Sequence, residues 1–449
     1  MTLKQLFPAS IVDDITYCID KAYPILALNY AWILRLEGEV STEISLKALD
    51  ETLNCYPKGR CVLTDKYPSY KHWFRYCWKL TGCEGKDIFR EIRMPDADFT
   101  MEDTVNYYVD NYTSLSIEPS SHVPLKVLLI RQPERAFLFF IMHHALADGG
   151  GSISFIRKFI TCYEDIFYRR ESAGHQDARL EDISLPHIRF QWSHFSPRLL
   201  RPYLSYSSLF RKEPPARLYT HALPVDSAVF IAGARDLPPQ RLETISTTAK
   251  KHRATINDDL LAAAFQTGKQ WSRAWALPSE RIYITVPINL RSPEDHTMSN
   301  ILSSVTVSLK TEAIGEKGAL LPLIHEQMTA LNKNEIAQTM VNLSCLLKPV
   351  PTALRRRLLK RAIPGFAPTL LLSNLGVLSP NPSHKDEKGF HYLGPARISN
   401  IYVIPNAASW PDLLVSTYNK QIAVTMAVLS SCFSPEAAEK FLDSFVEHI

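Results

Sequence analysis

The stretch Phe139–Gly151, FFIMHHALADGGG, decides how this sequence is interpreted. A hydrophobic, strand-like run leads directly into His143 and His144, and Asp148 follows just before three glycines. The end of a buried strand holds a titratable group rigidly, and histidine can accept a proton near neutral pH. Successive strand residues face opposite sides, so we expect only one of the two histidines to reach a given pocket. The stretch therefore predicts a general base beside a turn, with Asp148 either acting on substrate or fixing the loop.

Two other readings of the same stretch are a coincidence and a metal site. The fixed HHxxxDG spacing arises by chance in on the order of one chain in a thousand, which disfavours coincidence. Adjacent histidines on a strand chelate poorly, and no third-ligand motif accompanies them, so we expect no metal. The glycines from Gly149 onward would permit a sharp turn and tight packing behind the histidine.

Length and composition narrow the classes of protein that fit. The chain has 449 residues, which favours two lobes over one core. Its 46% hydrophobic and 21% charged residues exclude a disordered or coiled-coil protein, and 16 glycines argue against glycine-rich nucleotide loops. A net charge of +4 is too mild to indicate a nucleic-acid partner.

Cysteine usage and hydropathy indicate the compartment. The eight cysteines form no CxxC pair, which disfavours a zinc site and suits a reduced intracellular protein. The first residues lack the apolar core of a signal peptide, and no run reaches the roughly 18 apolar residues of a membrane span. We expect a soluble, monomeric, cytoplasmic protein, with association to a membrane surface as the alternative.

Hydrophobic periodicity predicts mixed strands and helices in both halves of the chain. In the first half it predicts strands at Tyr30–Gly38, Val123–Leu129 and Ala136–Met142, and helices at Ser41–Asn54 and Ser152–Arg169. In the second half it predicts strands at Val229–Asp236, Ile282–Pro287, Ser303–Leu309, Ser399–Ile404, Asp412–Tyr418 and Gln421–Leu429, and helices at Pro238–His252, Asn257–Trp275, Gly318–Leu331 and Ser434–His448. Strict βαβ alternation is missing, so the fold class is α/β or α+β with mixed sheets flanked by helices. We place an N-terminal lobe at 1–190, a crossover linker at 191–227 and a C-terminal lobe at 228–449.

The segment HHALADG resembles the HHxxxDG motif of the chloramphenicol-acetyltransferase-like superfamily. That superfamily includes condensation domains, BAHD acyltransferases, alcohol acetyltransferases and wax ester synthases. Three later segments are similar to segments of these families in order and spacing: Ala254–Asp258 (ATIND), Val286–Arg291 (VPINLR) and Val415–Gln421 (VSTYNKQ).

Two departures from these families stand out. The DFGWG motif of plant BAHD enzymes is absent, and LSNLGVL stands in its region at Leu372–Leu378. The RHExLRT stretch of condensation domains is also absent, and CYPKGRC stands there at Cys55–Cys61. The chain is therefore not a standard BAHD enzyme, and ordinary peptide-forming condensation is disfavoured.

The resemblance implies two similar lobes that meet in a V around a central tunnel. It implies catalytic positions at His143, His144, Asp148 and Gly149, with His144 as the general base. Asp148 would point away from the tunnel and pair with Arg291 as a structural salt bridge. Ser373 and Asn374 would lend a donor to the oxyanion on the acceptor side, although plain turn chemistry explains them equally well.

The reaction implied is acyl transfer from an acyl thioester, on CoA or on an acyl carrier protein, to a hydroxyl or amine. The acceptor would be a small molecule or a lipid, and the thioester would be a co-substrate, with no bound cofactor. Two alternatives remain open: carrier-dependent condensation that forms an amide or ester, and a catalytically silent binding module of the same fold.

A basic run at Lys348–Arg361 includes Arg355, Arg356 and Arg357. The simplest reading is a solvated helix face. The functional readings are docking of CoA phosphates, of an acidic carrier protein or of an anionic membrane, while nucleic acid is disfavoured because no aromatic platform accompanies the run. Elsewhere, Asn257 and Asp258 read as helix-capping residues, and Cys162 as a core residue.

Overall fold

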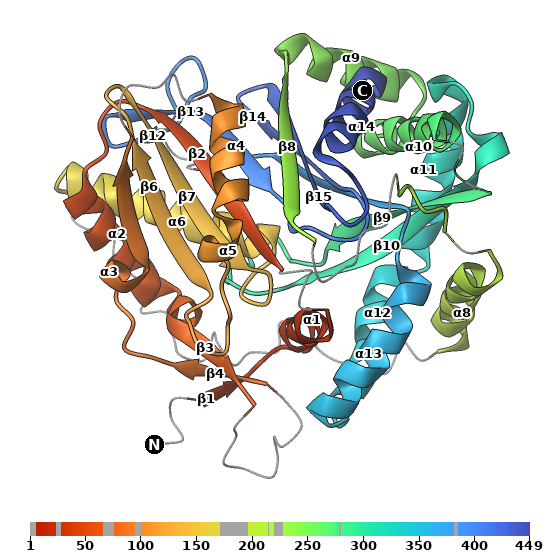
Figure 1. The fold of residues 1–449 in the computed structure, drawn as a ribbon, viewed down its shortest axis with the longest axis horizontal. Helices are drawn as coiled ribbons and strands as arrows, with labels where there is room; N and C mark the ends of the chain where they lie inside the picture. The colour runs from red at the N-terminus through yellow and green to blue at the C-terminus, as the bar shows by residue number, and fades with distance from the viewer. Residues whose placement is uncertain are drawn as a thin grey trace.

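A computed structural model gives the fold in two large sheets and one small one (Figure 1). It describes residues 6–23, 28–65, 76–94, 100–170, 196–213, 215–219, 228–275, 277, 280–380 and 385–449. The expected linker at 191–227 lies partly outside these residues, as does the boundary at 190.

The first sheet has six strands in the order β12-β13-β2-β7-β6-β5. Its strands are β2 (Asn29–Glu37), β5 (Phe89–Arg93), β6 (Leu125–Arg131), β7 (Arg135–His143), β12 (Tyr392–Leu393) and β13 (Ala396–Ile404). The predicted β6–β7 hairpin is present, and β2 pairs antiparallel with the other side of β7. Helices α2 (Thr42–Cys55) and α6 (Gly149–Phe167) pack together beside this sheet (Figure 1). β7 is buried almost throughout, because strands flank it on both sides.

The second sheet also has six strands, in the order β10-β9-β11-β14-β15-β8. Its strands are β8 (Phe230–Leu237), β9 (Arg281–Asn289), β10 (Leu302–Lys310), β11 (Leu370–Val377), β14 (Asp412–Tyr418) and β15 (Gln421–Leu429). Helices α9 (Pro239–Lys251), α10 (Ile256–Ala274), α11 (Lys317–Lys333) and α14 (Pro435–His448) gather on its outer side (Figure 1). Both sheets mix parallel and antiparallel pairs, as the missing βαβ alternation predicted.

Strand β13 joins the first sheet although it comes from the second half of the chain. It pairs antiparallel with β2 from Arg397 opposite Glu37 to Ile404 opposite Ala31. The chain then returns to the second sheet through β14. The first sheet therefore contains a strand from the second half of the chain.

Further elements complete the fold. They are β1 (Leu6–Pro8), α1 (Ile11–Ala22), β3 (Cys61–Thr64), β4 (Cys77–Leu80), α3 (Gly85–Ile88), α4 (Met101–Asp110), α5 (Tyr112–Leu115), α8 (Pro197–Lys212), α12 (Ile336–Ser344), η8 (Cys345–Leu347) and α13 (Thr352–Phe366). Strands β1, β4 and β3 form the small third sheet. Two expectations were wrong here: 197–212 is helical rather than aperiodic crossover, and the expected Ser-Asn-Leu-Gly turn lies inside β11.

Apolar packing joins the two lobes. One core cluster unites first-lobe residues such as Tyr108 and Phe139 with Phe230 and Ala427 of the second sheet. The ring of Phe230 stacks on Tyr112 at a centroid distance of 4.2 Å. Within the described residues, no helix is long and apolar enough to cross a membrane.

Candidate active site

His144 is the first residue beyond β7, and its backbone is fixed from two sides. Its N–H donates to the carbonyl of Leu28 at 2.6 Å, and its own carbonyl accepts from Nδ2 of Asn300 at 2.8 Å. The ring meets that of Tyr30 edge-on at 5.5 Å. Asn300 belongs to the second lobe, so both lobes hold this histidine in place.

The imidazole of His144 is biased towards its neutral form. Burial lowers its pKa below 6.5, and the nearby Asp148 carboxylate only partly opposes this effect. Nδ1 is buried and has no hydrogen-bond partner among the described residues, while the residue as a whole is partly exposed. Burial therefore closes the Nδ1 side of the ring to a substrate. A neutral ring with an accessible nitrogen at pH 7 is what general-base catalysis needs.

His143 faces the other way, as strand alternation predicted. Its side chain is fully buried, and its Nδ1 accepts from the N–H of Ala145 at 3.0 Å. The proton must then sit on Nε2, which lies 3.5 Å from Oδ1 of Asp20 on α1. This ring fixes the turn from inside and cannot meet substrate. This burial favours a supporting role for His143 over the catalytic one that the resemblance implied.

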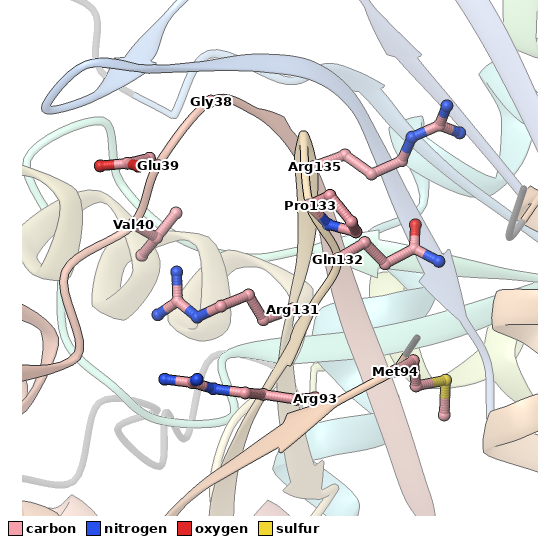
Figure 2. A pocket seen from close by; sticks show the side chains of 9 residues that line it. All are labelled: Gly38, Glu39, Val40, Arg93, Met94, Arg131, Gln132, Pro133 and Arg135. Carbon is pink, nitrogen blue, oxygen red and sulfur yellow. The ribbon is translucent and has the colours of Figure 1, made fainter. Parts of the chain in front are cut away.

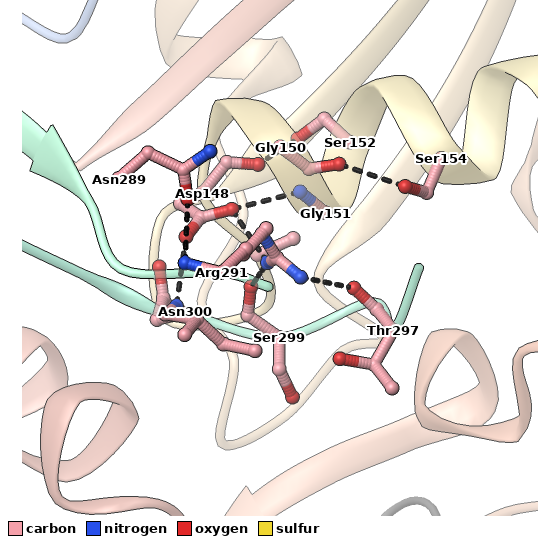
Figure 3. Close-up of polar contacts among 12 residues, drawn as sticks. Asp148, Gly150, Gly151, Ser152, Ser154, Asn289, Arg291, Thr297, Ser299 and Asn300 are labelled. Carbon is pink, nitrogen blue, oxygen red and sulfur yellow. Dashed lines mark hydrogen bonds and ion pairs between the residues drawn. The ribbon is translucent and has the colours of Figure 1, made fainter. Parts of the chain in front are cut away.

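Asp148 and Arg291, which the resemblance paired, lie together in the structure (Figure 3). Oδ1 of Asp148 accepts from Nη2 of Arg291 at 2.7 Å and from the N–H of Gly151 at 2.7 Å, and its Oδ2 accepts from the N–H of Ile301 at 2.7 Å. Arg291 also donates to the carbonyls of Thr297 and Ser299. The carboxylate caps α6 and ties it to the second lobe, so it holds the loop rather than acting on substrate.

The three glycines are required for close packing rather than for the sharp turn that the sequence predicted. None has a positive φ, and all three lie in the first turn of α6. A Cβ on Gly150 would stand 2.6 Å from Nε of Arg291, and one on Gly151 would stand 2.9 Å from the carbonyl oxygen of Ser299. A Cβ on Gly149 would meet only the flexible end of Leu375, at 2.9 Å. The helix can approach the second lobe this closely because these side chains are absent.

A buried ion pair under the histidine turn was not predicted from the sequence. Nζ of Lys58 lies 2.9 Å from Oδ2 of Asp13 and donates to the carbonyl of Leu146 at 2.7 Å. Oδ1 of Asp13 in turn accepts from Nδ2 of Asn300 at 2.9 Å. Burial lowers the pKa of the Lys58 ammonium below 10.5. Lys58 belongs to CYPKGRC, the segment that departs from the condensation-domain pattern. Its bond to the Leu146 carbonyl stabilises the backbone that follows His144.

The acceptor-side candidates, Ser373 and Asn374, lie within β11 and are partly exposed. The side chain of the next residue, Leu375, packs beside Gly149, which brings this end of β11 to the first turn of α6. Oδ1 of Asn374 accepts from the N–H of Gly376 at 2.9 Å. That bond occupies the amide's acceptor and leaves its Nδ2 donor end for other contacts.

The assignment of Arg355 to a docking surface was wrong. Its side chain is fully buried, and Nη1 bonds Oδ2 of Asp14 at 2.6 Å beneath α13. A buried guanidinium needs such a carboxylate, and α1 provides it. Arg356 is half-buried and Arg357 is exposed on the same helix.

Two smaller predictions also fall on described residues. Thr255 rather than Asn257 caps α10, and Asp258 completes a capping box with it, so the structural reading of ATIND holds for Asp258. Cys162 is buried within α6, in the core.

The cavity shown in Figure 2 lies far from His144. It has a volume of about 470 Å³, and its lining includes Arg93, Arg131 and Arg135. Arg135 begins β7 and His143 ends it, so the length of the strand, about 27 Å, separates this cavity from the histidine turn. It is a hollow at the opposite end of the first sheet. The tunnel expected at His144 stays a prediction.

Solved structures match this chain over nearly its whole length. The trichothecene 15-O-acetyltransferase TRI3 of Fusarium sporotrichioides has a TM-score of 0.74 at 12% identity, covering 99% of this chain and 95% of that one. The first condensation domain of the calcium-dependent antibiotic synthetase has a TM-score of 0.72 at 13% identity, with the same coverage. The starter condensation domain of rhizomide synthetase has a TM-score of 0.67 at 12% identity, covering 99% and 93%. No protein-family model matches the sequence, and no curated protein does.

At these identities the matches establish the fold alone. They confirm the two-lobed fold that the HHxxxDG resemblance predicted, with two sheets of six strands.

Proposed function

We propose that this protein transfers an acyl group from an acyl thioester to a hydroxyl or amine, with His144 as the general base. One observation carries the proposal: a partly exposed histidine with a depressed pKa is held by backbone bonds from both lobes, with its Nδ1 side buried. Asp148, the acid nearest to it in sequence, is engaged with Arg291. His144, rather than Asp148, is therefore the group that we propose acts on the substrate.

In the proposed step, Nε2 of His144 takes the proton from the acceptor hydroxyl as its oxygen attacks the thioester carbonyl. The carbonyl electrons move onto oxygen and form a tetrahedral oxyanion. When that intermediate collapses, the C–S bond breaks and the thiolate takes the proton from the imidazolium. The products are an ester, or an amide where the acceptor is an amine, and a free thiol, and the histidine returns to its neutral state.

Other residues have supporting roles in this proposal. Asp148 and Arg291 hold the turn between β7 and α6 against the second lobe. Ser373 and Asn374 are proposed as oxyanion donors, because Leu375 brings their strand to Gly149. Removing one such donor costs about 2.7–4 kcal/mol in enzymes where it has been measured.

The names and ligands of the matching proteins suggest which substrates to try first. One match is named as an O-acetyltransferase, and the rhizomide synthetase domain was solved with C8-CoA and Leu-SNAC. Acetyl-CoA and octanoyl-CoA are therefore sensible first donors, each paired with a panel of small alcohols, lipid alcohols and amines.

The test is release of CoA that depends on both donor and acceptor. CoA should be measured by chromatography, because the partly exposed free thiols of Cys55 and Cys83 would react with a thiol reagent. His144→Ala should lower the rate by about 10²–10⁴-fold, the usual contribution of a general base. His448→Ala, at a partly exposed histidine on α14, is the matched control and should keep the wild-type rate. An unchanged rate in His144→Ala would refute this mechanism.

Carrier-dependent condensation is the second candidate, and the matches to condensation domains favour it. Turnover with a thioester loaded on a carrier protein, but not with the CoA thioester, would select it. Thermal stabilisation by ligands without turnover across the panel would instead indicate a silent binding module.

A further inference from the structure

One face of α13 alternates leucine with arginine. Leu354, Arg357, Leu358 and Arg361 are spaced three or four residues apart, so they form one stripe along the helix. All four are exposed, with Leu354 at 47% and Leu358 at 43% of full exposure. We call this stripe the α13 face. The buried Arg355 lies about 100° around the helix from Leu354 and marks the side that packs on α1.

The helices around the α13 face continue its character. Helix α8 packs against both α12 and α13, and Figure 1 shows the three helices together at one end of the molecule. Five leucines of the described chain are exposed, and four of them lie here: Leu204 on α8, Leu346 on η8, and the two of the α13 face. Exposed leucines are therefore concentrated on these three elements.

The same elements contain no acidic residue. Between Glu335 and Asp386 the sequence has no Asp or Glu, and α8 has none either. Beneath α13, Asp13 and Asp14 of α1 are buried, and Asp14 is bonded to Arg355. The exposed charges on α13 and α8 are positive, with Arg198 and Arg201 adding to those of the α13 face. A mild net charge of +4 for the whole chain thus conceals a surface of one sign.

We propose that the α13 face binds an anionic lipid surface. Arginines interleaved with exposed leucines are suited to the boundary of a bilayer, where guanidinium groups meet lipid phosphates and leucines enter the acyl region. Each basic side chain near such a surface adds to the affinity, and salt weakens the attraction. Leucines spread over three neighbouring elements suit an extended, deformable surface better than one compact protein patch.

The direct test is flotation of the full-length protein with vesicles. The protein should float with vesicles of 30% phosphatidylserine in phosphatidylcholine at 0.1 M NaCl, and should stay behind with pure phosphatidylcholine or at 0.5 M NaCl. Arg357→Glu combined with Arg361→Glu should weaken binding by about 30-fold or more, because two attractive charges are lost and reversed. Leu354→Ser combined with Leu358→Ser should also weaken it.

Matched controls separate this surface from bulk charge and hydrophobicity. Lys250→Glu combined with Lys251→Glu makes the same change in net charge on α9, and both lysines are exposed. Leu323→Ser on α11 removes a leucine with the same 43% exposure as Leu358. Both controls should float like the wild type, and so should His144→Ala, because binding does not depend on turnover.

Three results would overturn the proposal. One is no flotation of the wild type with phosphatidylserine vesicles at 0.1 M NaCl. A second is equal loss in the Lys250/Lys251 control, which would reduce the effect to net charge. The third is salt-sensitive binding of an acidic carrier protein through Arg357 and Arg361 without vesicle binding. Failure of the acyl-transfer assay would leave the flotation result intact, so the two proposals fail separately.

Discussion

Replacing Arg291 by methionine tests how the two lobes fix the histidine turn. The side chains of Arg291 and Asp148 are 5% and 4% exposed, so the substitution leaves a buried carboxylate with only the N–H groups of Gly151 and Ile301. Breaking a buried pair in this way costs about 3–5 kcal/mol. At about 2.1 cal/mol/K per residue, a chain of this length that unfolds as one unit would lose about 3–5 °C in Tm.

A double-mutant cycle isolates the interaction itself. Asp148→Asn removes the charge and keeps an oxygen to cap α6. In the Arg291→Met/Asp148→Asn variant no buried charge is left unpaired, so its loss of stability should be smaller than the sum of the two single losses by at least about 1 kcal/mol.

Denaturant unfolding and thermal melts of the wild type and the three variants measure this difference. Losses that add within about 0.5 kcal/mol would refute the reasoning, because they would show no interaction between the two groups. Acyl transfer by Arg291→Met should fall as well, since the turn that holds His144 would lose its anchor on the second lobe.

Three further predictions follow from the same site. Burial holds the pKa of His144 below 6.5, so kcat/KM should fall only as pH drops below that value, which a pH–rate series checks. The free energy of unfolding should fall in the same range, because His144 binds a proton near pH 6.5 in the unfolded chain but not in the folded protein, and a pH–melting series checks this. Gly151→Ala should lower Tm by several degrees because its Cβ would meet the backbone of Ser299 at 2.9 Å, whereas Gly149→Ala should be mild because only a flexible side-chain end is displaced. Lys58→Met should destabilise by about 3–5 kcal/mol in denaturant unfolding, because it leaves its buried carboxylate partner on α1 unpaired.

Hydrophobic periodicity and helix-capping residues predicted the positions of several strands and helices. The alternating run at Ser303–Leu309 and the capped helix at Ser434–His448 lie within a residue of where the sequence placed them. Helix α8 was missed because Pro202 and its many aromatic side chains obscure helical periodicity. The position of β13 in the first sheet was also missed, because strand pairing across most of the chain leaves no local signal.

The site was predictable where a motif spans it and hidden where distant residues converge. The family resemblance carried by HHxxxDG and VPINLR implied the contact between Asp148 and Arg291 that the structure contains. No spacing could indicate that Asn300 and Asp13, 287 residues apart, meet by a hydrogen bond beneath the turn. The burial of Arg355 was likewise invisible, since its carboxylate partner lies at the other end of the chain.

The path of β13 has a consequence for how the chain folds during synthesis. In the first sheet, β2 pairs with β7 on one side and, on the other, with residues 397–404 of β13, far along the chain. Until that segment leaves the ribosome, β2 presents an open edge of unsatisfied backbone groups, which is where chains pair wrongly with one another. The first lobe therefore cannot be completed before the second is nearly synthesised, although it is translated first. A truncated chain that ends at the crossover would be prone to aggregation, because the first sheet would lack β13.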